Sequence, residues 1–250
     1  MKEFYINNDG IRLHSKLDMP ASWQEGDKCP LAIIIHGFTG HMEERHIRAV
    51  AETFNDLGIA SLRVDMYGHG SSDGEFHDHN LFKWLDGAMT VTDYAKKLDF
   101  VTDLYICGHS QGGLTTVMLA GMKPDDFKAA LPLSPAVYIC DGARKGFSHG
   151  QSFDPLHLPE EFEVAGLRLS GNYIRAAQML DVEGAIERFT RPVLIVHGDE
   201  DEAVPVEWAQ KAAEQYKDCR LALIHGDDHC YNYHLDKVLD AIREFISSIQ

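Results

Sequence analysis

One serine of this chain lies in a local pattern that suits nucleophilic catalysis. Ser110 stands in the middle of Gly108-His-Ser-Gln-Gly112, between the apolar run 104–107 and a helical pattern that begins directly after it. A Gly-x-Ser-x-Gly pattern at the junction of a strand and a helix is typical of a nucleophile elbow, a turn so tight that its flanking residues must lack large side chains. Because a serine hydroxyl is a poor nucleophile at neutral pH, Ser110 would need a histidine base that is oriented by a carboxylate.

An acid and a histidine follow Ser110 in the order that such chemistry requires on a parallel sheet. The strand-like run 192–196 is followed by acidic residues within 199–202, and the run 220–224 is followed by His229. The expected chain order is serine, acid, histidine, with each residue on the loop after a strand. We therefore expect Ser110, one of these acids and His229 to meet at one edge of a sheet.

The elements that must position these residues alternate along the chain. Apolar runs of strand length and patterns of helical spacing follow one another, and Asn8-Asp-Gly10 is a hairpin turn signal between the first two strands. This alternation predicts an α/β fold with a doubly wound, mostly parallel sheet that begins with a hairpin. The expected strands are 4–7, 12–19, 30–35, 59–65, 104–107, 129–133, 192–196 and 220–224, and the expected helices are 47–57, 81–98, 172–180, 206–216, 235–249 and one after the elbow.

The alternation stops between about 136 and 190. Seven glycine and proline residues interrupt it between 142 and 171, and its one clear helical pattern is at 172–180. Since the segment lies between two strands, we read the chain as a single domain, 1–250, with an inserted lid or cap at about 136–190. Ligands bind at the carboxyl ends of strands in open α/β sheets, so a long insertion there is expected to serve function, with surface decoration as the alternative.

Composition and charge exclude several classes of partner. The 250 residues carry a formal net charge of −16, which is unsuited to nucleic acid. No run approaches the roughly 20 apolar residues of a membrane helix, and the N-terminus lacks the apolar core of a signal peptide. The five cysteines are odd in number and scattered, which suits free thiols in a reducing compartment. We expect a cytoplasmic protein with a small-molecule partner; a homodimer is compatible with the sequence.

Fourteen histidines raise the question of a metal site. The pair in His77-Asp-His79 and the three histidines at 225, 229 and 234 lack the spacing and helical setting of a zinc hydrolase motif such as His-Glu-x-x-His. We therefore expect neither a metal nor a cofactor.

Over essentially its whole length the chain resembles the serine hydrolases of the α/β-hydrolase fold. The segment His36-Gly-Phe38 is similar to the family's oxyanion loop, and His197-Gly-Asp-Glu-Asp201, followed by Val204-Pro205, is similar to its acid loop. The resemblance implies an oxyanion hole built from the backbone N–H groups of Phe38 and Gln111.

The same resemblance selects among the candidate acids and bases. It implies Asp201 as the acid, with Asp199 as the alternative. It implies His229 as the base, because the family places this residue after a glycine and two further residues; His225 would then end the strand and bond locally.

In more detail the chain is similar to the bacterial cinnamoyl (feruloyl) esterases, in which a small inserted subdomain holds the phenolic ring of a hydroxycinnamate. This resemblance implies that Tyr173 bonds the ring hydroxyl, with Asp141 as an acidic partner and His149 or Gln151 as a further polar contact. Packing of an insertion helix is the alternative role of Tyr173. The segments that carry the similarity are His36–Gly40, Gly108–Gly113, Ser134–Ala136, Gly171–Arg175 and Gly226–Cys230.

The sequence thus predicts a serine carboxylic-ester hydrolase that works through an acyl-enzyme and favours hydroxycinnamate esters of the feruloyl or chlorogenate type. One alternative is a general short-chain carboxylesterase or monoacylglycerol lipase, in which the insertion forms an aliphatic tunnel. An alternative of another class is a non-catalytic small-molecule receptor on the same fold, since such a receptor can keep the triad.

Overall fold

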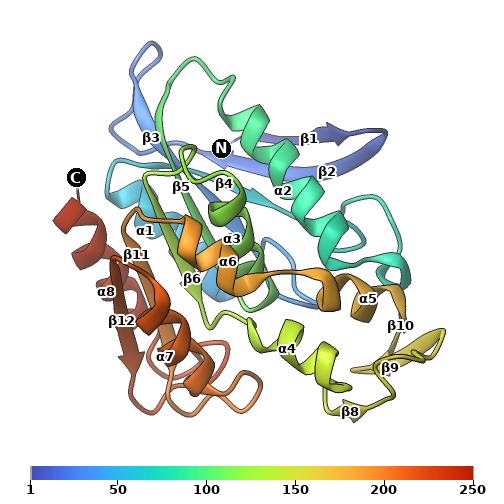
Figure 1. Cartoon of the computed structure of the whole chain (residues 1–250). Helices are drawn as coiled ribbons and strands as arrows, with labels where there is room; N and C mark the ends of the chain where they lie inside the picture. The colour runs from blue at the N-terminus through green and yellow to red at the C-terminus, as the bar shows by residue number, and fades with distance from the viewer. Residues whose placement is uncertain (1, 250) are drawn as a thin grey trace.

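A single eight-stranded sheet forms the centre of the protein. Its strands are β1 (Lys2–Asn8), β2 (Ile11–Asp18), β3 (Cys29–Ile35), β4 (Ala60–Val64), β5 (Val101–His109), β6 (Ala129–Leu133), β11 (Val193–Gly198) and β12 (Cys219–Ile224). The computed structural model describes residues 2–249 and places these strands in the order β1-β2-β4-β3-β5-β6-β11-β12 (Figure 1).

Six neighbouring strands of this sheet, from β4 to β12, run parallel, and β2 pairs antiparallel with both β1 and β4. The prediction of a doubly wound, mostly parallel sheet with a hairpin at its start is confirmed. Strands β3 and β11 are buried along almost their whole length. This explains why each appears in the sequence as a continuous apolar run, because helices cover both faces of a parallel sheet.

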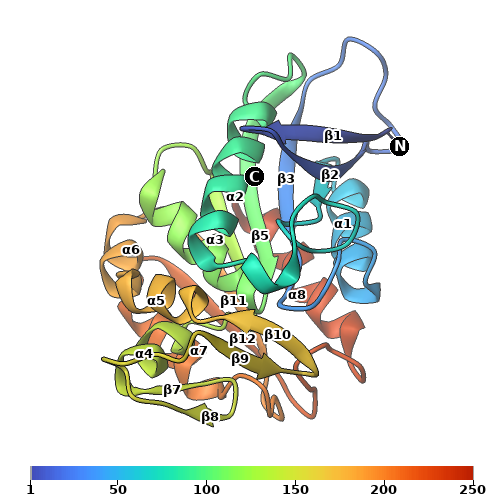
Figure 2. The same cartoon turned by 90° about the vertical axis from the view of Figure 1, so that its right-hand side faces the viewer.

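Helices pack on both faces of the sheet (Figure 2). One face is covered by α1 (Arg45–Asp56) and α8 (Leu235–Ile249), and the other by α2 (Leu81–Ala95), α3 (Gln111–Met122) and α7 (Val206–Gln215). Helix α3 is buried on all sides, since every residue from Gln111 to Gly121 lies in the interior. Among residues 2–249 none of the helices is long and apolar enough to cross a membrane.

The segment between β6 and β11 contains more regular structure than the sequence indicates. The sequence predicts only α5 there. The strands have two to four residues and α6 has seven, too few for a sustained period, and α4 is not predicted although its eight residues equal the length of α5. Most of them gather beyond the carboxyl ends of the central strands (Figures 1 and 2). The bounds are α4 (Tyr138–Lys145), β7 (Phe147–Ser148), β8 (Gln151–Ser152), β9 (Glu161–Val164), β10 (Leu167–Ser170), α5 (Asn172–Met179) and α6 (Val182–Arg188).

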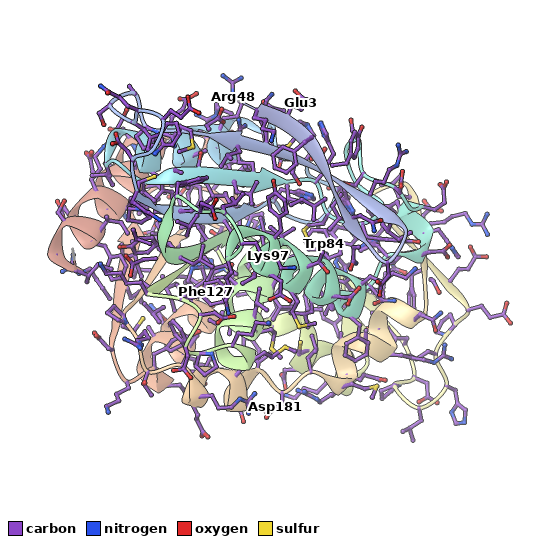
Figure 3. All side chains as sticks on the ribbon, turned by 90° about the horizontal axis from the view of Figure 1, so that it is seen from above. Glu3, Arg48, Trp84, Lys97, Phe127 and Asp181 are labelled. Carbon is purple, nitrogen blue, oxygen red and sulfur yellow. The ribbon has the colours of Figure 1, made fainter. Side chains whose placement is uncertain are left out.

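A group of buried histidines packs around Trp84 of α2. The ring centroids of His36 and His69 each lie 5.1 Å from that of Trp84, and His79 lies 4.8 Å from His69. Figure 3 shows Trp84 near the middle of the molecule and Arg48 at its edge. His36 follows β3 directly, and its ring supports the loop there, because its Nδ1 donates to the carbonyl of Gly37 at 2.7 Å.

These histidines are held in the neutral form. Burial, together with repulsion from His69, lowers the pKa of His36 to about 3 and the pKa of His79 to about 3. The ordinary value of about 6.5 applies to both side chains in the unfolded chain. Below pH 6.5 the unfolded state therefore binds protons that the folded state does not, and folding must become less favourable as the pH falls.

We predict that the free energy of unfolding decreases when the pH is lowered from 7 to 5. Each histidine with such a depressed pKa lowers the free energy of unfolding by about 1.4 kcal/mol for every pH unit that the pH falls between roughly pH 6.5 and pH 4. Urea unfolding of the wild type at the two pH values measures the change. The variant His79→Phe should show a smaller difference between pH 7 and pH 5, because one of the histidines that titrate on unfolding is gone.

The matched control is His157→Phe, since the His157 side chain is 83% exposed. It should keep the pH dependence of the wild type. Equal unfolding free energies at pH 7 and pH 5 in the wild type would contradict the prediction.

Candidate active site

Ser110 occupies a strained turn between β5 and α3. Its backbone angles are φ 55° and ψ −115°, a conformation that non-glycine residues rarely adopt. Neighbouring segments hold it there. The Ser110 amide donates to the carbonyl of Leu133 at 2.9 Å, and the carbonyl of Ser110 accepts from the amide of Ala136 at 3.0 Å. The elbow is thus tied to the end of β6 and to the start of the inserted segment.

The glycines of the elbow are required by close backbone contacts. A Cβ atom on Gly108 would lie 2.2 Å from the carbonyl oxygen of Gly112. A Cβ atom on Gly112 would lie 2.4 Å from the carbonyl oxygens of both Ile35 and His36. Neither position has room for alanine, so the glycines allow α3 to pack directly against the end of β3.

The expected oxyanion loop lies directly against the nucleophile. A Cβ atom on Gly37 would stand 3.2 Å from the Cβ of Ser110, so the backbone next to Phe38 passes over the elbow. The amide of Gln111 opens α3, where the first N–H groups of a helix have no partner in the helix itself. Within residues 2–249 neither the Phe38 amide nor the Gln111 amide makes a hydrogen bond. Both are available to a developing oxyanion.

The acid and the histidine of the acid–base pair lie on the loops after β11 and β12. His229 Nδ1 is 2.6 Å from Asp201 Oδ2, and the His229 side chain is 19% exposed. The other carboxylate oxygen of Asp201 accepts from the amides of Ala203 at 2.9 Å and Val204 at 2.8 Å. With Nδ1 directed at the acid, Nε2 of His229 is the ring atom left to act as a base.

A second histidine supports the acid. His197 Nε2 lies 3.2 Å from Asp201 Oδ2 and 2.9 Å from the carbonyl oxygen of Val204, in a fully buried position. Burial opposes ionisation of Asp201, yet the hydrogen bonds from His197 and His229 outweigh it and hold the pKa of Asp201 well below its ordinary value. His197 is not among the expected site residues; its signal in the sequence is a polar residue at the end of a buried strand.

The two alternative residues pair with each other on the surface. His225 Nδ1 is 2.8 Å from Asp199 Oδ2, and Asp199 also accepts from the amide of Gly226 at 2.7 Å. The His225 side chain is 92% exposed. This pair therefore closes the turn between the two loops, on the outside of the Asp201–His229 pair.

Of the residues expected to bind substrate, Tyr173 and His149 lie with the oxyanion loop. The Tyr173 hydroxyl is fully buried and donates to Oε1 of Gln111 at 2.6 Å. The ring centroid of Phe38 is 4.6 Å from His149 and 5.8 Å from Tyr173, and those of His149 and Tyr173 are 5.4 Å apart. These three rings are here called the aromatic cluster, and Tyr173 connects the cluster to Gln111, the residue after the nucleophile.

Asp141 and Gln151 have other partners in the structure. Asp141 lies on α4 and forms an ion pair with Lys145 at 2.8 Å. Gln151 donates from Nε2 to the carbonyl of Glu163, between the two small hairpins of the inserted segment. In the described part of the chain no hydrogen bond joins either residue to Tyr173, whose hydroxyl donates to Gln111. The expected contacts of Asp141 and Gln151 with a substrate ring stay predictions.

The arrangement is equipped for acyl transfer by an activated serine. It combines a serine on a strained turn, a histidine that is paired with an ionised and buried carboxylate, and two free amides where an oxyanion would form. Among residues 2–249 there is no group of three or more histidine, cysteine or acidic side chains that could hold a metal ion.

Known proteins share this architecture. The family described as serine aminopeptidase, S33, matches residues 27–153. A structure of Est1E from Butyrivibrio proteoclasticus with bound ferulic acid superposes with a TM-score of 0.96 at 56% sequence identity, and the alignment covers 98% of each chain.

Two groups of curated relatives are more distant. The mitochondrial palmitoyl-protein thioesterase ABHD10 of Mus musculus is 25% identical over 75% of this chain, and the alignment spans only 64% of the thioesterase's own length. A monoacylglycerol lipase of Mycolicibacterium smegmatis is 24% identical over 87% of this chain and 88% of the lipase.

The two neighbouring acids allow a matched test of the site. We predict that Asp201→Asn slows covalent labelling of Ser110 by a fluorophosphonate about 10³- to 10⁴-fold, because the amide would no longer orient or stabilise the histidine. Asp199→Asn should label at nearly the wild-type rate, since its partner is the exposed His225. Equal labelling rates for the two variants would contradict the assignment of the acid.

Proposed function

This chain belongs to the α/β-hydrolase family of serine hydrolases described as serine aminopeptidase, S33, and we propose that it hydrolyses carboxylic esters through an acyl-enzyme, with hydroxycinnamate esters as its favoured substrates. The observation that carries the proposed chemistry is the 2.6 Å contact between His229 Nδ1 and Asp201 Oδ2, with the carbonyl of His229 bonded to His109, the residue before the strained Ser110. The observation that carries the substrate class is the 56% identity to a protein whose structure contains ferulic acid.

In the first half of the reaction Ser110 Oγ attacks the ester carbonyl. His229 Nε2 takes the hydroxyl proton, and the ionised Asp201 stabilises the resulting imidazolium. The carbonyl oxygen becomes an oxyanion and accepts hydrogen bonds from the amides of Phe38 and Gln111. Loss of one such donor costs on the order of 3 kcal/mol of transition-state stabilisation. When the tetrahedral intermediate collapses, His229 returns the proton to the departing alcohol and leaves an acyl group on Ser110.

In the second half a water molecule replaces the alcohol. His229 takes a proton from this water, whose oxygen attacks the acyl carbonyl, and the same two amides bind the second oxyanion. His229 then protonates Ser110 Oγ, and the carboxylic acid leaves. The low pKa of Asp201 keeps its carboxylate charged through both halves, which lets His229 alternate between base and acid.

The aromatic cluster of Phe38, His149 and Tyr173 supports an aromatic acyl group. Planar rings gain from stacked and edge-to-face contacts beyond the area they bury, by about 0.5–1.5 kcal/mol per pair. Burial lowers the pKa of His149 to about 4, so at neutral pH this ring offers an uncharged surface. A saturated chain would gain none of the aromatic contribution, which favours a cinnamoyl group over an aliphatic one.

The Tyr173 hydroxyl has a defined part in this proposal. Its donation to Gln111 Oε1 leaves its oxygen lone pairs as acceptors for a phenolic O–H of the substrate. Burial raises the pKa of Tyr173 well above 10, so its hydroxyl stays protonated and keeps its bond to Gln111. Asp141 would contribute only if its ion pair with Lys145 opened.

We place the protein in the cytoplasm and give it a small-molecule ester as partner. The five cysteines Cys29, Cys107, Cys140, Cys219 and Cys230 are all unpaired, which agrees with a reducing compartment.

The mechanism is tested first by Ser110→Ala. We expect this variant to keep the fold and to lose roughly four to six orders of magnitude in kcat on p-nitrophenyl acetate, because the nucleophile is absent. Circular dichroism checks the fold. Retained turnover would refute the mechanism, and a wild type that is labelled by a fluorophosphonate without multiple turnover would indicate a receptor.

The substrate class is tested by comparing kcat/KM of the wild type on methyl ferulate, p-nitrophenyl acetate and a monoacylglycerol. The matched control is an unactivated aliphatic methyl ester of similar size. We expect kcat/KM to be higher on methyl ferulate than on this control ester and on the monoacylglycerol. Preference for the monoacylglycerol would favour the lipase alternative and contradict the proposed aromatic acyl site.

A further inference from the structure

The residue before the nucleophile is hydrogen-bonded to the residue that acts as the base. His109 Nε2 lies 2.7 Å from the carbonyl oxygen of His229, across 120 positions of the sequence. The two rings also pack together, with centroids 4.7 Å apart. A direct link of this kind joins the elbow to the loop after β12.

The direction of this bond defines the state of His109. A carbonyl oxygen can only accept, so Nε2 carries the proton and Nδ1 of the neutral ring carries none. Burial, followed by repulsion from His46 and His229, holds the pKa of His109 well below its ordinary value. His109 therefore stays uncharged beside His229, where a second cation would oppose formation of the imidazolium.

The surroundings leave the His109 ring little freedom to turn. Its centroid lies 4.4 Å from that of His46 and 5.8 Å from that of Tyr231. In addition, a Cβ atom on Gly37 would meet His109 Nδ1 at 3.1 Å. The N–H donor of His109 is thus fixed by packing against the oxyanion loop, α1 and the loop after β12 that carries His229, here called the base loop.

His229 is consequently held at two places. Asp201 holds the side chain at Nδ1, at 2.6 Å, and His109 holds the main chain at the carbonyl, at 2.7 Å. Other bonds restrain the same loop from outside the catalytic groups, such as that from Arg45 to the carbonyl of Tyr231 at 2.6 Å. The bond from His109 differs from these, because it comes from the residue covalently joined to Ser110.

We propose that His109 is a positioning residue that sets the distance between the nucleophile Ser110 and the base His229. The inference rests on the proposed function, since it assigns His109 a part in the same site. Ser110 and His229 belong to separate segments, and a rigid bridge from the elbow to the base loop aligns them before substrate binds. Displacement of a catalytic group by about 1 Å can cost about a hundredfold in rate.

The test compares two substitutions of nearly equal length. His109→Gln keeps an N–H donor near the position of Nε2, whereas His109→Met fills the space without a donor. We expect His109→Met to lower kcat on p-nitrophenyl acetate by about ten- to a hundredfold with little change in KM, because the loss lies in alignment rather than in binding. His109→Gln should recover most of that loss.

The rate of fluorophosphonate labelling of Ser110 is measured in parallel, and thermal unfolding of each variant checks stability. Labelling should fall in His109→Met and recover in His109→Gln. His109→Phe, which keeps a planar ring without a donor, takes the place of His109→Met if the latter does not fold. Equal rates for the glutamine variant and the donor-less variant, or a change confined to KM, would overturn the proposal.

Failure of the proposed substrate class gives a different result. In that case the wild type shows no preference for methyl ferulate, while the labelling rates still compare the His109 variants directly. The two hypotheses are therefore decided by separate measurements.

Discussion

The backbone of Ser110 is the constraint on which the rest of the site depends. A non-glycine residue at φ 55° and ψ −115° costs of the order of 1–3 kcal/mol, and such strain persists only where the surroundings hold it. Here the hydrogen bonds to Leu133 and Ala136, together with the close contacts of Gly108 and Gly112, impose the turn. The result is a hydroxyl raised above the sheet at the first turn of a buried helix, where free amides are available for an oxyanion.

Parallel strands make it possible for distant segments to reach this serine. Because β3, β5, β11 and β12 all run in one direction, the loops after them meet at one edge of the sheet, and each can supply a single group. Local hydrogen bonds then give each group its chemical state. Asp201 is ionised although it is buried, since two backbone amides, His197 and His229 all satisfy its oxygens.

The inserted segment is connected to the catalytic groups through side chains. Tyr173 of α5 donates to the side chain of Gln111, whose own amide belongs to the proposed oxyanion hole. The aromatic cluster places the ring of Phe38 against two rings of the insertion. Selection of the acyl group and stabilisation of the oxyanion would therefore involve the same residues, so a change in the insertion is expected to affect the rate as well as the affinity.

The sequence by itself determined the order of strands and helices, the elbow and the sequence of serine, acid and histidine, because hydrophobic periodicity and the glycine pattern are local properties. Tertiary structure alone decided how the polar side chains pair. It joined Asp201 to His229 and Asp199 to His225, bonded Tyr173 to Gln111, and brought His109 and His197 against the base and the acid. The short elements α4 and α6 were equally invisible in the sequence. Apart from the contact of His197 with Asp201, these pairings span 26 to 120 positions and depend on how the loops pack, and a one-dimensional pattern carries no information about that packing.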